Sequence, residues 1–190
     1  GEKAQRVNIA GSAQVDDRRL LLDLDGRLGA RDRVALLVDA EPDGDDFDLA
    51  LDASAAADGP IAALAGLDAP LDMRVRGDGT WTQWEGALLV RSEDERVAAL
   101  QLTNRAGRFG LLGTVDPTVF LTGLPAEALG DKVALKGDIA IDNRVFDGTA
   151  IVAGRKVSLS AEGLVDLADN RADDLEMVVR VRDPAVLGDG

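Results

Sequence analysis

Two short acidic segments are the first candidates for chemistry, because carboxylates held close together can bind a metal ion. Asp43-Gly44-Asp45-Asp46 and Asp23-Leu24-Asp25-Gly26 space their carboxylates as a calcium-binding loop could, since Ca²⁺ takes its oxygen ligands from flexible loops. Neither segment is followed by the bidentate acid that completes such a loop. Both have the composition of solvated turns, as do Asp173-Asp174 and Glu93-Asp94-Glu95. We therefore expect no metal site, and nothing in the sequence implies a cofactor.

No group of residues in the sequence has the pattern of a catalytic site. The chain has no histidine and no cysteine, so the commonest general base and the thiol nucleophile are both missing. Two carboxylates could hydrolyse a glycosidic bond if one were desolvated, but we expect every Asp and Glu in a turn or on the solvent-facing side of a strand. No serine lies in the Gly-x-Ser-x-Gly turn of a hydrolase; the serines considered are Ser12, Ser54, Ser92, Ser158 and Ser160. We predict no catalytic residues and no enzymatic activity.

A glycine-rich segment and two tryptophans have both a functional and a structural interpretation. Gly77-Asp78-Gly79 neither matches the phosphate-binding pattern nor opens a helix, so we predict a bulge or a tight bend there. Trp81 and Trp84 could stack on a ligand, but such a pair near a hairpin is typical of packing anchors at the rim of a sheet.

Composition excludes several classes of partner. The 190 residues carry a net charge of −14, which argues against nucleic acid because phosphate binding draws on clustered Lys and Arg. No segment approaches the ~20 apolar residues of a membrane-spanning helix. Hydrophobic residues make up 46% and aromatic residues 3%, so the apolar surface is built from Ala, Leu and Val. The chain begins Gly1-Glu2-Lys3 within a strand-like pattern, and we expect a segment of a longer protein.

Strict alternation of apolar and charged residues is the main structural signal. Leu71, Met73 and Val75 alternate with charged residues, which places apolar side chains on one face of a strand and charges on the other. Similar segments recur along the chain. Their apolar positions, which are the candidate groove residues, are Phe47, Leu49, Leu51, Leu71, Met73, Val75, Val133, Leu135, Ile139, Ile141, Val157, Leu159, Val179 and Val181.

Short turns and a few helices separate these strands. The predicted turns are Arg31-Asp32, Asp43 to Asp46, Ser92 to Glu95, Asn104 to Gly107, Asn143-Arg144 and Ala153 to Arg155. Proline at the first position predicts short helices over Pro60 to Leu67, Pro117 to Leu121 and Pro125 to Leu129. Asp116 is the expected N-cap of the second helix and Gly130 the C-terminal stop of the third.

The pattern repeats about every sixty residues. Arg76-Gly77-Asp78 corresponds to Lys136-Gly137-Asp138, and Trp84-Glu85-Gly86 to Phe146-Asp147-Gly148. The predicted organisation is one continuous structural unit made of the tail of a repeat (1–59), two repeats led by short helices (60–116 and 117–183) and the start of another (184–190). Because an open sheet can grow by repeated hairpins, we predict an all-β fold: an elongated, curled antiparallel sheet with an apolar groove. A β-sandwich is the alternative.

Two functions fit such an apolar face. An open face could shield acyl chains, for which exposure of about fifteen methylenes to water costs roughly 12 kcal/mol. A strand of six to eight residues spans ~20–26 Å, which is comparable to an extended acyl chain. The alternative is a structural or adhesive β-repeat protein with a dry core and no lipid groove.

Two segments carry a resemblance to a known family. Leu71 to Gly86 (LDMRVRGDGTWTQWEG) and Gly107 to Leu121 (GRFGLLGTVDPTVFL) resemble the repeat region of the translocation and assembly module TamB family, which belongs with the AsmA-like bridge proteins, and the similarity extends over about Leu20 to Val181. The resemblance implies a β-taco, or repeating β-groove, that conducts phospholipid between the inner and outer membranes of a Gram-negative bacterium and supports outer-membrane biogenesis. It implies a periplasmic location, an inner-membrane tether outside this segment, and contact with phospholipid acyl chains, flanking repeats of the same chain and an outer-membrane TamA-like barrel. It supplies no catalytic residues.

Overall fold

The computed structural model describes residues 7–16, 18–41, 43–65, 69–142, 144–166 and 171–182. The chain divides into two compact units, an N-terminal unit (Gly1–Val97) and a C-terminal unit (Ala98–Gly190), with the division inside β7. The strands are β1 (Val7–Asp16), β2 (Arg19–Leu28), β3 (Asp32–Glu41), β4 (Asp46–Ala55), β5 (Leu71–Gly79), β6 (Gln83–Ser92), β7 (Glu95–Arg105), β8 (Arg108–Val115), β9 (Val133–Asp142), β10 (Val145–Ala153), β11 (Val157–Asp166) and β12 (Arg171–Val181). The helices are α1 (Pro60–Ala65), the 3₁₀ turn η1 (Pro117–Val119) and α2 (Leu124–Leu129).

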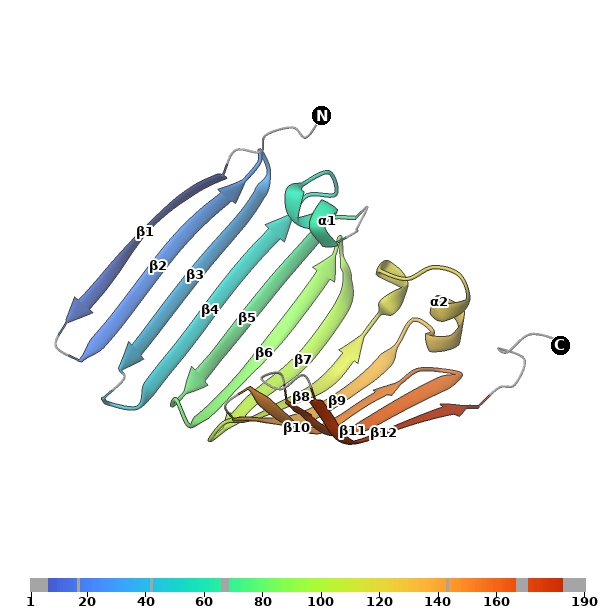
Figure 1. Ribbon diagram of the computed structural model, residues 1–190. Coiled ribbons are helices and arrows are strands. Elements are labelled where there is room, and N and C mark those ends of the chain that lie inside the picture. The colour runs from blue at the N-terminus through green and yellow to red at the C-terminus, as the bar shows by residue number, and fades with distance from the viewer. Residues whose placement is uncertain are drawn as a thin grey trace. The chain divides into compact units, whose positions relative to one another are not determined.

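Within each unit the hydrogen-bonded order of the strands is their order along the chain, and the paired strands are antiparallel. Figure 1 shows the N-terminal unit as one broad layer of strands, with α1 at the end where β4 passes to β5. In the part of the chain that the structure describes, four strands precede α1, four separate it from η1 and α2, and four follow. Asp45, in the longer turn before β4, and Glu93, in the two-residue turn between β6 and β7, have positive φ. Two-residue hairpins commonly require this backbone region.

The prediction of an all-β antiparallel fold with a few short helices is confirmed. The sandwich alternative does not describe the N-terminal unit, because no second sheet lies against the layer within its described residues. Leu51, in the middle of the central strand β4, is only half-buried, whereas a central leucine between two packed sheets would be fully buried. Among the described residues the buried apolar side chains are few. They are Ala40, Ala55, Ala62 and Val97 in the N-terminal unit, and Ala98, Leu100, Pro117 and Val133 in the C-terminal unit.

The helices begin at or next to the predicted prolines, and the second is shorter than predicted. α1 begins at Pro60 and ends at Ala65; the rest of the predicted segment, to Leu67, lies outside the described residues. The second predicted helix is a single 3₁₀ turn, whose N-cap is Asp116 as predicted: its carboxylate accepts a 2.9 Å hydrogen bond from the Thr118 backbone N–H. α2 ends at Gly130, with φ 79°, as predicted.

The glycine-rich segment differs from the prediction at Gly77. Gly79, with φ 141°, lies at the bend into the next hairpin, but Gly77 sits in regular register between Leu49 and Gly86. The reason for a glycine there is packing across the sheet. A Cβ at Gly77 would lie 2.0 Å from the indole of Trp84, so the absent side chain makes room for the ring.

Candidate functional site: the apolar face of each sheet

The apolar face of the N-terminal unit arises from the register of six strands. Since residues directly opposite each other share a face, the pairings define rows that cross the sheet. Three adjacent rows are Ile9, Gly26, Val34, Ala53, Met73 and Val90; then Gly11, Leu24, Leu36, Leu51, Val75 and Leu88; then Ala13, Leu22, Val38, Leu49, Gly77 and Gly86. None of them contains a polar side chain. From β2 to β6 these side chains are mostly half-buried, so the face is a continuous apolar surface.

The candidate groove residues predicted in this unit all lie on that face. Leu71, Met73 and Val75 occupy alternate positions on β5. On β4, Leu51 pairs with Val75 and Leu49 pairs with Gly77. Phe47 is two residues before Leu49 on β4 and therefore lies on the same face, opposite Ala40. Sequence reasoning missed the contribution of β2 and β3. A signal was present on β2, where Leu22 and Leu24 alternate with Asp23 and Asp25, whereas on β3 the apolar Leu37 interrupts the alternation between Leu36 and Val38.

The predicted residues of the C-terminal unit also share one face. The central row is Leu100, Gly113, Leu135, Val152, Leu159 and Val179. Val133 and Val157 lie on the same face, as do Ile139, Ile141 and Val181, because each is an even number of positions from the central row on its own strand. The opposite face is less polar than in the N-terminal unit, since Leu112 and Ile151 flank Lys136 and are exposed.

An aromatic cluster lies at one end of the N-terminal apolar face. The ring centroids of Phe47 and Trp81 are 4.5 Å apart, and those of Phe47 and Trp84 are 6.3 Å apart. Trp84 lies over Gly77 and Gly86. These contacts are those of packed side chains at the rim of the sheet. Packing against Phe47 and over the glycines therefore explains why tryptophans occupy positions 81 and 84, and no ligand is needed to explain them.

A buried carboxylate lies at the other end of that face. Asp32, the first residue of β3, is 1% exposed. One carboxylate oxygen accepts a 2.9 Å hydrogen bond from the Ala56 N–H, and the other a 2.8 Å bond from the Ile61 N–H. The expectation that every acidic residue lies in a turn or on a solvent-facing side is therefore wrong at Asp32. The hydrogen bond from Ile61 ties the start of α1 to the first residue of β3, and Ala62 of α1 is fully buried.

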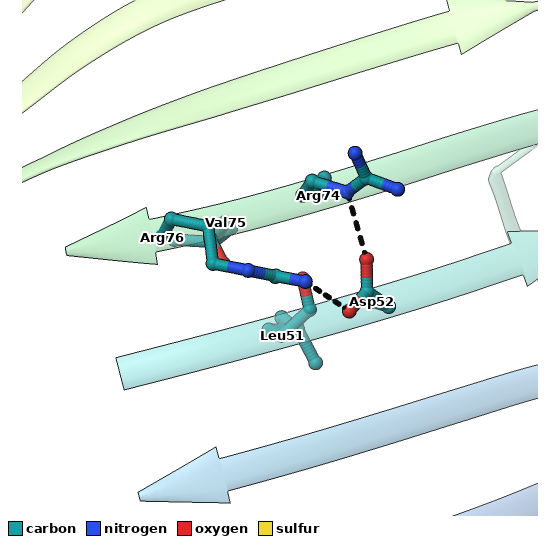
Figure 2. Close-up of polar contacts among 5 residues, drawn as sticks. All are labelled: Leu51, Asp52, Arg74, Val75 and Arg76. Atoms are coloured by element: carbon teal, nitrogen blue, oxygen red, sulfur yellow. Dashed lines mark hydrogen bonds and ion pairs between the residues drawn. The ribbon is translucent and has the colours of Figure 1, made fainter. Parts of the chain in front are cut away.

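The opposite face of the N-terminal unit is charged and carries ion pairs. Asp52 on β4 pairs with Arg74, 3.0 Å away, and with Arg76 on β5. Figure 2 shows both guanidinium groups reaching Asp52, and Arg76 also donates 3.1 Å and 2.7 Å hydrogen bonds to the carbonyl oxygens of Leu51 and Val75. The hydrogen bond from Arg76, followed by that from Arg74, lowers the pKa of Asp52. These side chains are exposed, so each pair contributes little to stability.

The titration of Asp52 gives a first prediction. A carboxyl whose pKa is lowered by folding stabilises the fold above its unfolded pKa, and that contribution is lost as the pH falls through the folded pKa. We expect the Asp52 carboxyl resonance in a pH titration by NMR to have its midpoint below 3.8, the ordinary value. Arg76→Gln should raise that midpoint more than Arg74→Gln. Equal midpoints in the parent and both variants would contradict the assignment.

The charged face of this unit also contains a hollow of about 950 Å³. Its lining includes Arg27, Arg33 and Arg91 together with Asp25 and Asp72. Charges of both signs interleave there, so the hollow has no strong preference for a cation or an anion. Within the described parts of the chain no three acidic side chains gather as metal ligands would, and no helix there is long and apolar enough to cross a bilayer.

Comparison with known proteins gives no assignment. A scan against protein-family models, a search of curated proteins and a search of solved structures each found no match.

Proposed function

We propose that the apolar face of the strands in each unit binds acyl chains, so that this chain is a lipid-carrying segment and not an enzyme. The observation that carries the proposal is the row Leu24, Leu36, Leu51, Val75 and Leu88, which crosses the middle of the N-terminal unit while its members stay half-buried. Apolar area that remains in contact with water is a source of binding free energy, at roughly 25 cal/mol per Å². A contiguous apolar surface is typical of an interaction site.

The composition of the face suits a flexible and variable ligand. Its side chains are mostly Leu, Val and Ala, without the convergent polar groups that orient a small molecule in a specific pocket. A strand of ten residues, such as β4, is about 33 Å long at ~3.3 Å per residue. That length is sufficient for an extended acyl chain along a strand or for several chains across it.

The proposal extends to the cellular setting through the resemblance to the TamB family. In that setting the chain lies in the periplasm, tethered to the inner membrane by a segment outside this sequence, and its neighbours are flanking repeats and an outer-membrane TamA-like barrel. The acyl chains belong to phospholipids moving between the two membranes. These partners follow from the resemblance, whereas the register of the strands supports the proposal through the apolar face alone.

A structural or adhesive repeat protein, the second candidate, requires a dry core. The half-buried leucines of the central strands count against it within the N-terminal unit, because a dry core excludes water from such positions.

Site-specific photo-crosslinking tests the acyl-binding proposal. A benzophenone amino acid at Leu49 is expected to form lipid adducts after incubation with phospholipid vesicles, and the same group at Asp48, on the charged face, is not. Leu135 and Lys136 form the corresponding pair in the C-terminal unit. Absent adducts at Leu49 and Leu135, or equal adducts at both members of each pair, would refute the proposal.

A further inference from the structure

Two arginines on the charged face of the N-terminal unit lie directly opposite each other. Arg27 on β2 pairs in register with Arg33 on β3, and both side chains are exposed. Like charges at directly opposed positions of an antiparallel pair are destabilising. An anion held between the two guanidinium groups would remove that repulsion.

The two arginines differ from others on the same face, which contact a carboxylate. The ion pairs of this kind are Arg19 with Asp39, Arg74 with Asp52, and Arg76 with Asp52. Figure 2 shows the last two, in which a single carboxylate serves two guanidinium groups. Within the parts of the chain that the structure describes, neither Arg27 nor Arg33 has an acidic partner.

Neutral polar side chains flank the two arginines along the same row of the sheet. Asn8 on β1 lies opposite Arg27, and Ser54 on β4 lies opposite Arg33. All four residues line the hollow of about 950 Å³ on the charged face. The arginines therefore stand in the wall of an open space, beside an amide and a hydroxyl that can donate further hydrogen bonds.

The hollow as a whole contains charges of both signs, but positive charge is in excess around this pair. Asp25, two residues from Arg27 on β2, supplies one carboxylate beside two guanidinium groups. The opposed acids Asp39 and Asp48 lie six residues along β3 from Arg33, which is about 20 Å at ~3.3 Å per residue. That separation exceeds the Debye length of about 8 Å at physiological ionic strength, so those acids do not neutralise the pair.

We propose that Arg27 and Arg33 together bind the phosphate group of a phosphate monoester. The planar guanidinium fork matches phosphate oxygens and can donate two parallel hydrogen bonds to them. A monoester phosphate carries about −1.5 to −2 charges near pH 7, which balances two arginines, whereas a carboxylate or a phosphodiester carries a single charge. The site lies on the face opposite the apolar one, so the proposal does not rest on acyl-chain binding.

Isothermal titration calorimetry of the whole 190-residue chain at constant ionic strength tests the specificity. Methyl phosphate is expected to bind at least about tenfold more tightly than dimethyl phosphate or acetate, because only the monoester supplies the second charge. Equal affinities for the three anions, or no binding of methyl phosphate, would overturn the proposal.

The decisive variant is Arg27→Gln/Arg33→Gln, which should weaken methyl phosphate binding by at least about tenfold. The matched control, Arg19→Gln/Arg76→Gln, removes the same charge from the same face but leaves the opposed pair intact, and it should bind within about threefold of the parent. Both variants should keep the circular dichroism spectrum of the parent. Equal losses in the two variants would show that overall charge governs binding and would refute the site.

Amide resonances of the parent chain locate the site without relying on a variant that must fold. During titration with methyl phosphate, the largest NMR shifts are expected at Arg27, Arg33 and Ser54. Largest shifts elsewhere in the chain would contradict the assignment.

Phosphatidylcholine vesicles that contain phosphatidic acid present the same monoester group on a membrane. If the parent binds methyl phosphate and also sediments with these vesicles, while Arg27→Gln/Arg33→Gln does neither, the group belongs to a lipid headgroup. Binding of methyl phosphate without sedimentation identifies a soluble phosphate ester.

Discussion

Replacing Asp32 with alanine is expected to lower the free energy of unfolding of the N-terminal unit by about 2–4 kcal/mol. The carboxylate is buried and accepts hydrogen bonds from the backbone N–H groups of Ala56 and Ile61. Each buried N–H left without an acceptor costs about 1–3 kcal/mol. Removal of a buried carboxylate also removes its desolvation cost, so the net loss is smaller than the sum of the two bonds.

Two variants separate this effect from a simple change of charge. Asp32→Asn keeps one acceptor oxygen but turns an amide NH₂ toward the second N–H, so its loss should be intermediate. Asp58→Ala removes an exposed carboxylate whose ion pair with Arg31 measures 3.1 Å, and such a pair is worth about 0–1 kcal/mol. The measurement is native-state amide hydrogen exchange. Faster exchange at Ala56 and Ile61 in Asp32→Ala, with Asp58→Ala like the parent, is expected, whereas equal exchange in all chains would show that Asp32 does not hold α1.

Local alternation was sufficient to predict which face the apolar side chains of β5 and β9 occupy. On β5 and β9 each apolar residue follows a polar or small one. Because successive side chains of a strand point to opposite faces, this alternation places the apolar residues on the buried face of a half-buried strand. The all-β fold and the grouping of the groove residues on one face in each unit both follow from that period. The positions of the short helices followed from proline, because proline is tolerated at the first turn of a helix and not in its interior.

The missed features depend on contacts between residues distant in the sequence. Asp32 accepts hydrogen bonds from residues 24 and 29 positions away, and its own neighbours, Arg31 and Arg33, have the composition of a turn. Gly77 was interpreted from its local glycine-rich sequence, whereas the reason for that glycine is the indole of Trp84 on the next strand. Periodicity indicates which face a side chain occupies, but it does not identify the group that it meets there.

A glutamate on the apolar face is expected to abolish acyl-chain binding without unfolding the sheet. Leu51 lies at the centre of the face, between Leu36 and Val75, and because it is half-buried its side chain meets both the sheet and any bound chain. A carboxylate in contact with an acyl chain loses water without gaining a partner, and that desolvation costs several kcal/mol if the group stays charged. Leu51→Glu should therefore weaken binding of a fluorescent fatty acid by more than about tenfold, which corresponds to a loss of about 1.4 kcal/mol.

The adjacent residue supplies the control, because it carries the same charge to the other face of the same strand. Ala50 lies opposite Arg76 and Leu37 on the charged face, so a glutamate there gains a cation within reach. Ala50→Glu adds an equal repulsion toward an anionic ligand, yet it should bind the fatty acid within about twofold of the parent, a difference of about 0.4 kcal/mol. Both variants should keep the circular dichroism spectrum of the parent. Equal losses in the two variants would mean that charge alone governs binding, and no loss in either would place the acyl chains elsewhere than on the row through Leu51.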